Sequence, residues 1–202
     1  MLRKIFLISL VAIMAVGTVA IARYPHRRNS SVFLNSPSSR DKPIALADIK
    51  TDMLIPAGSA PVAPAFAEGK WINSDPFTIE KLRGRVLLVE FWTFGCYNCR
   101  NTLPSVKEWD QQFRDRGLTI IGVHTPELSE EYDLDNLRRE VPSLGIKYAV
   151  VTDNDYKTWK AYNLEAWPTI FVIDKQGRIR WQHVGEGRYE ETESVIKELL
   201  AE

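Results

Sequence analysis

The feature that most constrains this chain is an apolar run that leads directly into a pair of cysteines. Residues 85–92, RVLLVEFW, have the composition of a buried strand, and Cys96 and Cys99 follow after a short turn. Residues 96–116 are then predicted to form a helix that ends at Gly117 and is kinked by Pro104. A strand, a CxxC turn and a helix are therefore expected in immediate succession.

Cys96 and Cys99 are the only cysteines of the 202 residues. The three histidines, His26, His124 and His183, do not stand at zinc-finger spacing from them, so a tetrahedral zinc site has no support. A disulfide that closes so short a loop removes little entropy from the unfolded chain. We therefore interpret the two cysteines as a chemically active pair rather than as a structural crosslink.

The two cysteines are expected to play unequal parts. At a helix N-terminus, free backbone N–H groups and the helix dipole stabilise an anion, which favours the Cys96 thiolate as the exposed nucleophile. Cys99, one turn along, is within reach of any sulfur that Cys96 has attacked and can resolve a mixed disulfide. Tyr97 and Asn98, between them, are expected to tune the stability of the thiolate.

Glu90 interrupts the apolar strand with an acid. Strand alternation places it on the same side as Leu88 and Trp92. If the side chain is buried, desolvation raises its pKa, and it can accept the Cys99 proton through a water as that thiol attacks. The alternative is an edge strand with the carboxylate in water.

The chain begins with a basic and apolar leader. Residues 5–22 carry no charge, and residues 1–42 hold 7 Lys and Arg against 1 acid, compared with 19 against 25 in the remainder. We predict that residues 1–22 are a membrane anchor or a cleaved signal peptide, with a buried helix as the remaining alternative. The first two place the body outside the cytoplasm, and its acidic balance argues against nucleic-acid binding.

Residues 23–67 are rich in Ser, Pro and Ala and lack a sustained period, which predicts a partly extended linker. Their short apolar pieces could instead pack on the edge of the domain. From residue 68 to residue 202, strand and helix patterns alternate. Strands are predicted over 70–72, 85–92, 118–124, 148–152, 169–174 and 178–184, and helical segments over 78–82, 96–116, 133–140, 155–162 and 190–200.

The order of these elements gives the fold class. A βαβ unit comes first, and the last two strands are joined by Lys175-Gln176-Gly177, a connection typical of a hairpin. An α/β domain with a mixed central sheet and helices on both faces is therefore expected.

Several stretches carry a family resemblance. LLVEFWTFGCYNCRNTLPSVKEWD, GLTIIGVHTPE, AWPTIFVID and QGRIR resemble thioredoxin-like thiol:disulfide oxidoreductases of the TlpA and DipZ group, and the resemblance runs from about Lys70 to the C-terminus. It implies a thioredoxin-like fold with Cys96 as nucleophile, Cys99 as resolving thiol and Glu90 as a buried acid. It also implies that Pro104 is the kinking proline of the active-site helix.

The same resemblance implies that the Trp167-Pro168 peptide bond is cis and lies against the CxxC, where the neighbouring backbone pairs with an extended substrate. Trp167 would border this groove, and the alternative is that it is a core aromatic. We count Trp92, Tyr97 and Asn98 with Trp167 and Pro168 as candidate substrate contacts.

Other polar residues are interpreted more plainly. His124 follows a strand end, where functional residues gather in α/β sheets, but a capping or packing role is favoured. His183 is expected on a strand surface. The run ELSEEYDLD lacks the ligand pattern of a calcium loop and is interpreted as a solvated helix start.

Together these features predict an extracytoplasmic thiol:disulfide oxidoreductase that reduces or exchanges disulfides in exported, cysteine-containing client proteins. No cofactor and no resident metal are expected. DipZ proteins carry electron-delivering membrane helices and this chain has at most one span, so a separate membrane electron donor is expected.

Three alternatives remain open. A Cu(I) metallochaperone would use both cysteines with help from His124. A thiol peroxidase would use a Pro-x-x-x-Thr-x-x-Cys site, which Thr93 fits, whereas Val89 stands in place of the proline. A non-enzymatic interaction domain would not depend on Cys96.

Overall fold

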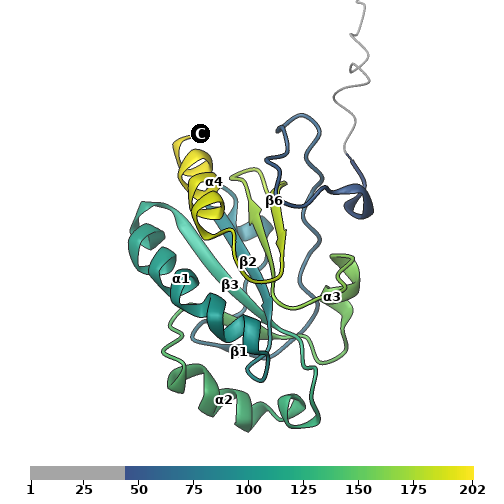
Figure 1. Ribbon diagram of the computed structural model, residues 1–202, viewed down its shortest axis with the longest axis vertical. Coiled ribbons are helices and arrows are strands. Elements are labelled where there is room, and N and C mark those ends of the chain that lie inside the picture. Colours follow the sequence, from purple (N-terminus) through teal and green to yellow (C-terminus); the bar gives the residue numbers. More distant parts are fainter. Residues whose placement is uncertain (1–43) are drawn as a thin grey trace, which may run out of the picture. The chain divides into compact units, whose positions relative to one another are not determined.

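The computed structural model describes residues 44–202, and within them six strands form one mixed sheet (Figure 1). The strand order is β1-β4-β3-β2-β5-β6. Strands β2, β3 and β4 are parallel, whereas β1, β5 and β6 each run antiparallel to a neighbour. The mixed sheet and the β5–β6 hairpin are confirmed. The strands are β1 (Trp71–Ile72), β2 (Val86–Trp92), β3 (Leu118–His124), β4 (Ala149–Thr152), β5 (Thr169–Ile173) and β6 (Ile179–Val184).

Helices cover both faces of this sheet, as expected for an α/β domain. Buried side chains of α1, α2 and α4 share one apolar cluster, and those of α3 belong to a second cluster on the opposite face. The helices are α1 (Tyr97–Phe113), α2 (Leu134–Ser143), α3 (Lys157–Ala161) and α4 (Tyr189–Ala201), with 3-10 turns at Leu46–Asp48, Glu80–Leu82, Arg114–Arg116 and Ser129–Tyr132.

Strand β2 runs through the centre of the sheet, between β3 and β5, and all seven of its residues are buried. Leu88 and Trp92 join the cluster beneath α1, and Val89 and Phe91 join the cluster on the other face. By the two-residue period of a strand, Glu90 faces the α1 side. The edge-strand alternative for Glu90 is therefore wrong.

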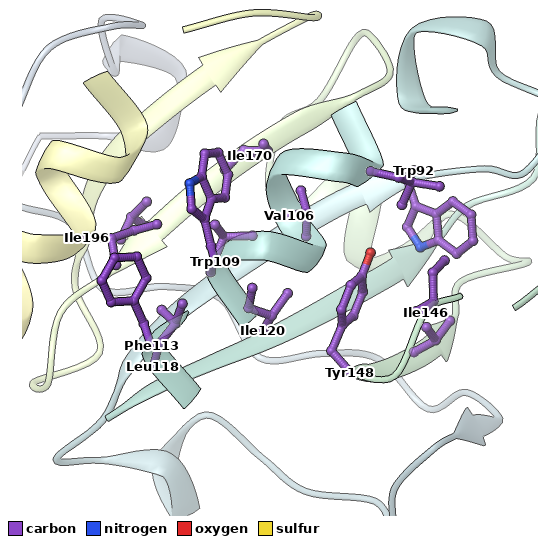
Figure 2. Packing of buried hydrophobic residues seen from close by; sticks show 14 of the residues in the cluster. Trp92, Val106, Trp109, Phe113, Leu118, Ile120, Ile146, Tyr148, Ile170 and Ile196 are labelled. Atoms are coloured by element: carbon purple, nitrogen blue, oxygen red, sulfur yellow. The ribbon is translucent and has the colours of Figure 1, made fainter. Parts of the chain in front are cut away.

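Helix α1 lies over that side of β2 because its apolar residues recur every three or four positions. Cys99, Leu103, Val106 and Trp109 are all buried against the sheet, and Figure 2 shows the last two within the cluster. A 3-10 turn follows α1, and this helical segment ends at Gly117, whose φ of 108° is a conformation that favours glycine. Pro104 lies inside the helix, as predicted.

Helix α2 is longer than the sequence indicated. We expected it to end with Arg138 and Arg139 at residue 140, but it continues to Ser143. Leu137 and Val141 lie one turn apart and both are buried, so packing extends the helix beyond its charge pattern.

Residues 44–67 pack against the sheet. Ile55, Ala60 and Ala63 are buried in the second cluster, and the Ile55 N–H donates to the Arg180 carbonyl at 2.8 Å. Of the two interpretations of the predicted linker 23–67, the packed one therefore describes this part of the chain. The predicted leader 1–22 and residues 23–43 lie outside the described residues, and no helix within 44–202 is long and apolar enough to cross a membrane.

This packing also corrects the prediction for His183. Its ring is 5% exposed, and Nδ1 lies 2.7 Å from Oδ1 of Asp52. The prediction of a surface position was wrong because residues 44–67 add a layer at β6 that the strand pattern alone does not reveal.

Candidate functional site

The two cysteines lie where the central strand passes into the first long helix. Cys96 is the N-cap of α1, with non-helical φ and ψ of −71° and 118°, and its sulfur accepts a hydrogen bond from the Cys99 backbone N–H at 3.2 Å. Both cysteines are free thiols. The sulfur of Cys96 thus satisfies a backbone N–H that a helix N-terminus leaves without an intrahelical partner.

The surroundings of Cys96 favour its thiolate form. Its side chain is half-buried, and its pKa is lowered to about 7 by the side chain and the backbone N–H of Cys99. Partial burial and the negative charge of Glu127 oppose this shift. A substantial fraction of Cys96 is therefore thiolate near neutral pH, which is the nucleophilic form.

Cys99 has the opposite environment. It has no solvent exposure, and burial, followed by the neighbouring Cys96, raises its pKa well above the ordinary value. The charge of Glu90 acts in the same direction. Cys99 therefore keeps its proton until a nearby base removes it.

Glu90 is the nearby acid beneath α1. It is fully buried, and desolvation raises its pKa to about 8 against the pull of a hydrogen bond from Tyr148. The Tyr148 hydroxyl donates to Oε2 at 3.1 Å, and within residues 44–202 Oε1 has no hydrogen-bond partner. The carboxyl can thus exchange a proton close to neutral pH.

A second buried carboxylate, Glu131, holds the turn that carries Cys96. Oε1 accepts from the Gly95 N–H at 2.7 Å, and Oε2 accepts from the N–H groups of Glu127 and Leu128 at 2.7 and 2.8 Å. A side chain at Gly95 would place its Cβ 2.6 Å from Glu131 Oε1, so it would displace the carboxylate from this position. We predicted that the run ELSEEYDLD is a solvated helix start. For Glu131 this prediction is wrong, because its side chain is 1% exposed.

The pKa of Glu131 is lowered. Burial would raise it, but the Thr93 hydroxyl and the three backbone N–H groups outweigh that effect. The donors from Glu127 and Leu128 are local to the turn, whereas Gly95 and Thr93 become neighbours only when the loop after β3 folds back over the end of β2.

His124 lies beside the same turn and is buried. Its Nε2 is 3.2 Å from the Thr93 hydroxyl, and its ring stacks on Phe94 at a centroid distance of 5.5 Å. Burial lowers the His124 pKa to about 4, so the ring is neutral at physiological pH. The geometry agrees with the favoured packing role.

A shallow groove opens at Cys96. Tyr97 is 76% exposed, Asn98 is exposed, and Trp167 is half-buried with its ring on Trp159 at a centroid distance of 4.1 Å. The lining residues are Gly95, Cys96, Tyr97, Asn98, Glu127, Glu165, Ala166 and Trp167.

Two predictions meet different outcomes at this groove. The Trp167-Pro168 peptide bond is cis, as the resemblance implied. Trp92 has no solvent exposure and packs edge-on against His124 within the core. Because its strand position turns the ring beneath α1, Trp92 cannot contact a substrate in the groove.

A metal-binding function would need a cluster of ligating side chains. Across residues 44–202, no group of three or more His, Cys, Asp and Glu side chains is arranged to hold a metal ion.

Comparisons with known proteins agree with this geometry. A family model described as the AhpC/TSA family matches residues 61–182. Protein DipZ of Mycobacterium tuberculosis is 40% identical over 133 residues, which are 64% of this chain, and the chain spans only 19% of that relative's length. The thiol-disulfide oxidoreductase YkuV of Bacillus subtilis is 27% identical over 143 residues, covering 70% of this chain and 95% of YkuV.

The solved structure of a thioredoxin-like superfamily protein also matches. It is 27% identical, with a TM-score of 0.67, and the match covers 71% of this chain and 98% of that protein. The thioredoxin-like fold predicted from the sequence is confirmed.

Proposed function

Because the chain belongs to the AhpC/TSA family and shares the thioredoxin-like fold and thiol:disulfide oxidoreductase class of its relatives, we propose that it reduces or exchanges disulfides in exported proteins. The predicted enzyme class and the resemblance to the DipZ group are confirmed. The observation that supports the finer proposal is the division between a half-buried Cys96 of lowered pKa and a buried Cys99 of raised pKa.

The first step uses the thiolate of Cys96. It attacks one sulfur of a client disulfide, a mixed disulfide forms between Cys96 and that sulfur, and the other client sulfur leaves as a thiolate. Cys99 then gives its proton to Glu90 and attacks the Cys96 sulfur. A Cys96–Cys99 disulfide forms, the second client sulfur leaves, and the client has gained the two electrons that this protein has lost.

The client is proposed to bind along the groove. Tyr97, Asn98 and Trp167 line it together with Cys96, and Pro168, which directly follows Trp167, is buried. An extended client segment can pair with the backbone beside Pro168, so main-chain contacts would bind it without demanding one sequence. This suits an enzyme that accepts different cysteine-containing clients.

The compartment is part of the same proposal. The apolar leader 5–22 would deliver or tether the body outside the cytoplasm, where disulfides persist. Each turnover leaves the protein oxidised, so reduction of a further client requires a separate electron donor at the membrane.

The geometry of the site gives little support to the two alternative functions, a copper chaperone and a thiol peroxidase. In a copper chaperone His124 would be the third ligand, but its ring is buried and its Nε2 lies at hydrogen-bond distance from the Thr93 hydroxyl. In a thiol peroxidase the place of the proline is taken by Val89, a buried residue in the middle of β2.

Reduction of insulin by dithiothreitol tests the activity. The wild-type chain is expected to accelerate precipitation of the insulin B chain, Cys96→Ser to leave the uncatalysed rate, and Cys99→Ser to accumulate a mixed disulfide. Wild-type protein that is no faster than Cys96→Ser would contradict the proposed function.

The compartment has its own test. In intact cells that express the full chain, a membrane-impermeant maleimide is expected to label Cys96 before lysis. Labelling of Cys96 only after lysis would contradict an extracytoplasmic location.

A further inference from the structure

The contact between Tyr148 and Glu90 gives the two oxygens of the buried carboxylate different surroundings. Tyr148 is 3% exposed and donates to Oε2 at 3.1 Å, while Oε1 has no hydrogen-bond partner in the part of the chain that the structure describes. Figure 2 shows the Tyr148 hydroxyl directed into the apolar cluster rather than towards solvent. A buried polar atom without a partner is costly, which makes Oε1 the natural acceptor for an incoming proton.

The sheet leaves a gap for this contact. Glu90 pairs with Gly122 of β3, and Gly122 pairs with Val150 of β4, so Tyr148 must reach across β3 to meet Glu90. A Cβ at Gly122 would lie 3.3 Å from Cε2 of Tyr148 and 2.7 Å from Nε1 of Trp92. The glycine therefore makes room first for the Trp92 indole and, less strictly, for the Tyr148 ring over the middle strand.

The titratable groups around the Glu90 carboxyl lie on α1 and its N-cap and, at Tyr148, just before β4. Cys96, the N-cap of α1, and Cys99 within the helix interact electrostatically with Glu90, and Asp110 of the same helix acts on Tyr148. Burial, and then the charge of Glu90, raise the Tyr148 pKa well above its ordinary value. The phenol thus remains protonated at physiological pH and serves Glu90 only as a donor.

We infer that Tyr148 is a positioning residue for the resolving step: it holds Oε2 of Glu90 and leaves Oε1 to take the proton of Cys99. This inference rests on the proposed function. In the step, the S–H bond of Cys99 breaks, its proton passes to Oε1, and the freed electron pair forms the bond to the Cys96 sulfur. The bond between Cys96 and the client sulfur breaks at the same time, and that sulfur leaves with the electron pair.

The chain supplies a matched control in Tyr162. It is also buried, it lies in the cluster on the opposite face, and its hydroxyl donates to the Pro64 carbonyl at 2.9 Å. Tyr148→Phe and Tyr162→Phe therefore each remove one buried hydroxyl and one hydrogen bond. Only the first removes a donor to Glu90.

The experiment uses 5,5′-dithiobis(2-nitrobenzoic acid) and the full chain. Cys96 releases one thionitrobenzoate as it forms a mixed disulfide, and Cys99 releases the second as it resolves it. In Tyr148→Phe, loss of the donor disfavours the carboxylate, so we expect the pH midpoint of the second release to rise by about one unit and its rate at pH 7 to fall about tenfold. The first release is expected to be unchanged, and Tyr162→Phe is expected to match wild type in both.

Two further variants secure the result. Site-specific 3-fluorotyrosine at position 148, a stronger donor of nearly the same size, is expected to lower the midpoint, so the inference does not depend on Tyr148→Phe folding. In the Glu90→Gln background, Tyr148→Phe is expected to have no added effect on the second release.

The outcomes separate this inference from the function on which it rests. A wild-type chain that releases no second thionitrobenzoate overturns the proposed function. A wild-type chain that resolves normally, with Tyr148→Phe giving the wild-type profile or Tyr162→Phe giving the same shift as Tyr148→Phe, overturns only the role of Tyr148.

Discussion

Two buried glutamates serve the same pair of cysteines from different regions, Glu90 beneath α1 and Glu131 in the loop after β3. Both are at most 1% exposed. Glu90 accepts one hydrogen bond, from Tyr148, and its pKa is raised to about 8. Glu131 accepts three bonds from backbone N–H groups, and its pKa is lowered.

The difference teaches that burial does not by itself decide the charge of a carboxyl group. Desolvation acts on both residues, and the number of donors decides the outcome. Glu131, whose pKa is lowered, is an anion at neutral pH and holds the Gly95 turn in place, whereas the raised pKa of Glu90 lets it gain and lose a proton close to neutral pH. We propose that Glu131 supports the geometry of the site and that Glu90 takes part in its chemistry.

The largest effect on the rate of disulfide reduction is expected from loss of the Cys96 sulfur, which neither glutamate can replace. Cys96→Ser removes the sulfur that both regions serve and is expected to lower the rate of disulfide reduction by at least about a thousandfold, because an alcohol does not ionise near neutral pH. The insulin assay measures this. Residual activity within tenfold of wild type would show that Cys99 attacks clients directly.

Glu131→Gln tests the structural carboxylate. An amide has one oxygen and cannot accept on both sides, so we expect a loss of about 2 to 4 kcal/mol in the free energy of unfolding at pH 7. Urea denaturation measures this loss, and Glu130→Gln, at the exposed neighbouring position, is the control with an expected change within about 0.5 kcal/mol.

The pH dependence of the same variant follows from the lowered pKa of Glu131. Its contribution to stability is present above the ordinary pKa of 4.5 and is lost as pH falls through the lower folded value. The difference between wild type and Glu131→Gln is therefore expected to shrink below about pH 4. A difference that grows with acidity would contradict the assignment.

Glu90→Gln should show the opposite sign. The folded pKa is raised from 4.5 to about 8, so between these values the unfolded chain releases a proton that the folded chain keeps, and wild-type stability falls as pH rises. We expect Glu90→Gln to be free of this loss and to gain about 1 to 3 kcal/mol relative to wild type between pH 5 and pH 8. Parallel stability curves from urea denaturation would reject the raised pKa.

The smallest effect is expected on the pKa of Cys96, which depends on its contact with Cys99. Cys99→Ala removes the side chain that contributes most to lowering the Cys96 pKa, so that pKa is expected to rise from about 7 by about one unit. The pH dependence of iodoacetamide alkylation measures it. Val106→Ala, which alters packing two turns further along α1, should leave the midpoint unchanged.

The core of the site could be predicted because its parts are local. Cys96 and Cys99 are three residues apart, and the apolar run before them indicates both the strand and the inward side of Glu90. The cis bond at Trp167-Pro168 came from the family resemblance, since most X-Pro bonds are trans. Trp92 was misassigned because alternation indicates a face of the sheet but not what covers it.

The sequence by itself determined the order of strands and helices and the position of the reactive pair, because hydrophobic periods and helix signals act between neighbours along the chain. Only the tertiary structure decided which carboxyl is charged. Glu90 meets Tyr148 across 58 residues and Glu131 meets Gly95 across 36. The pKa of a buried group depends on the donors that surround it in space, and those donors are assembled by the sheet and by the loop after β3.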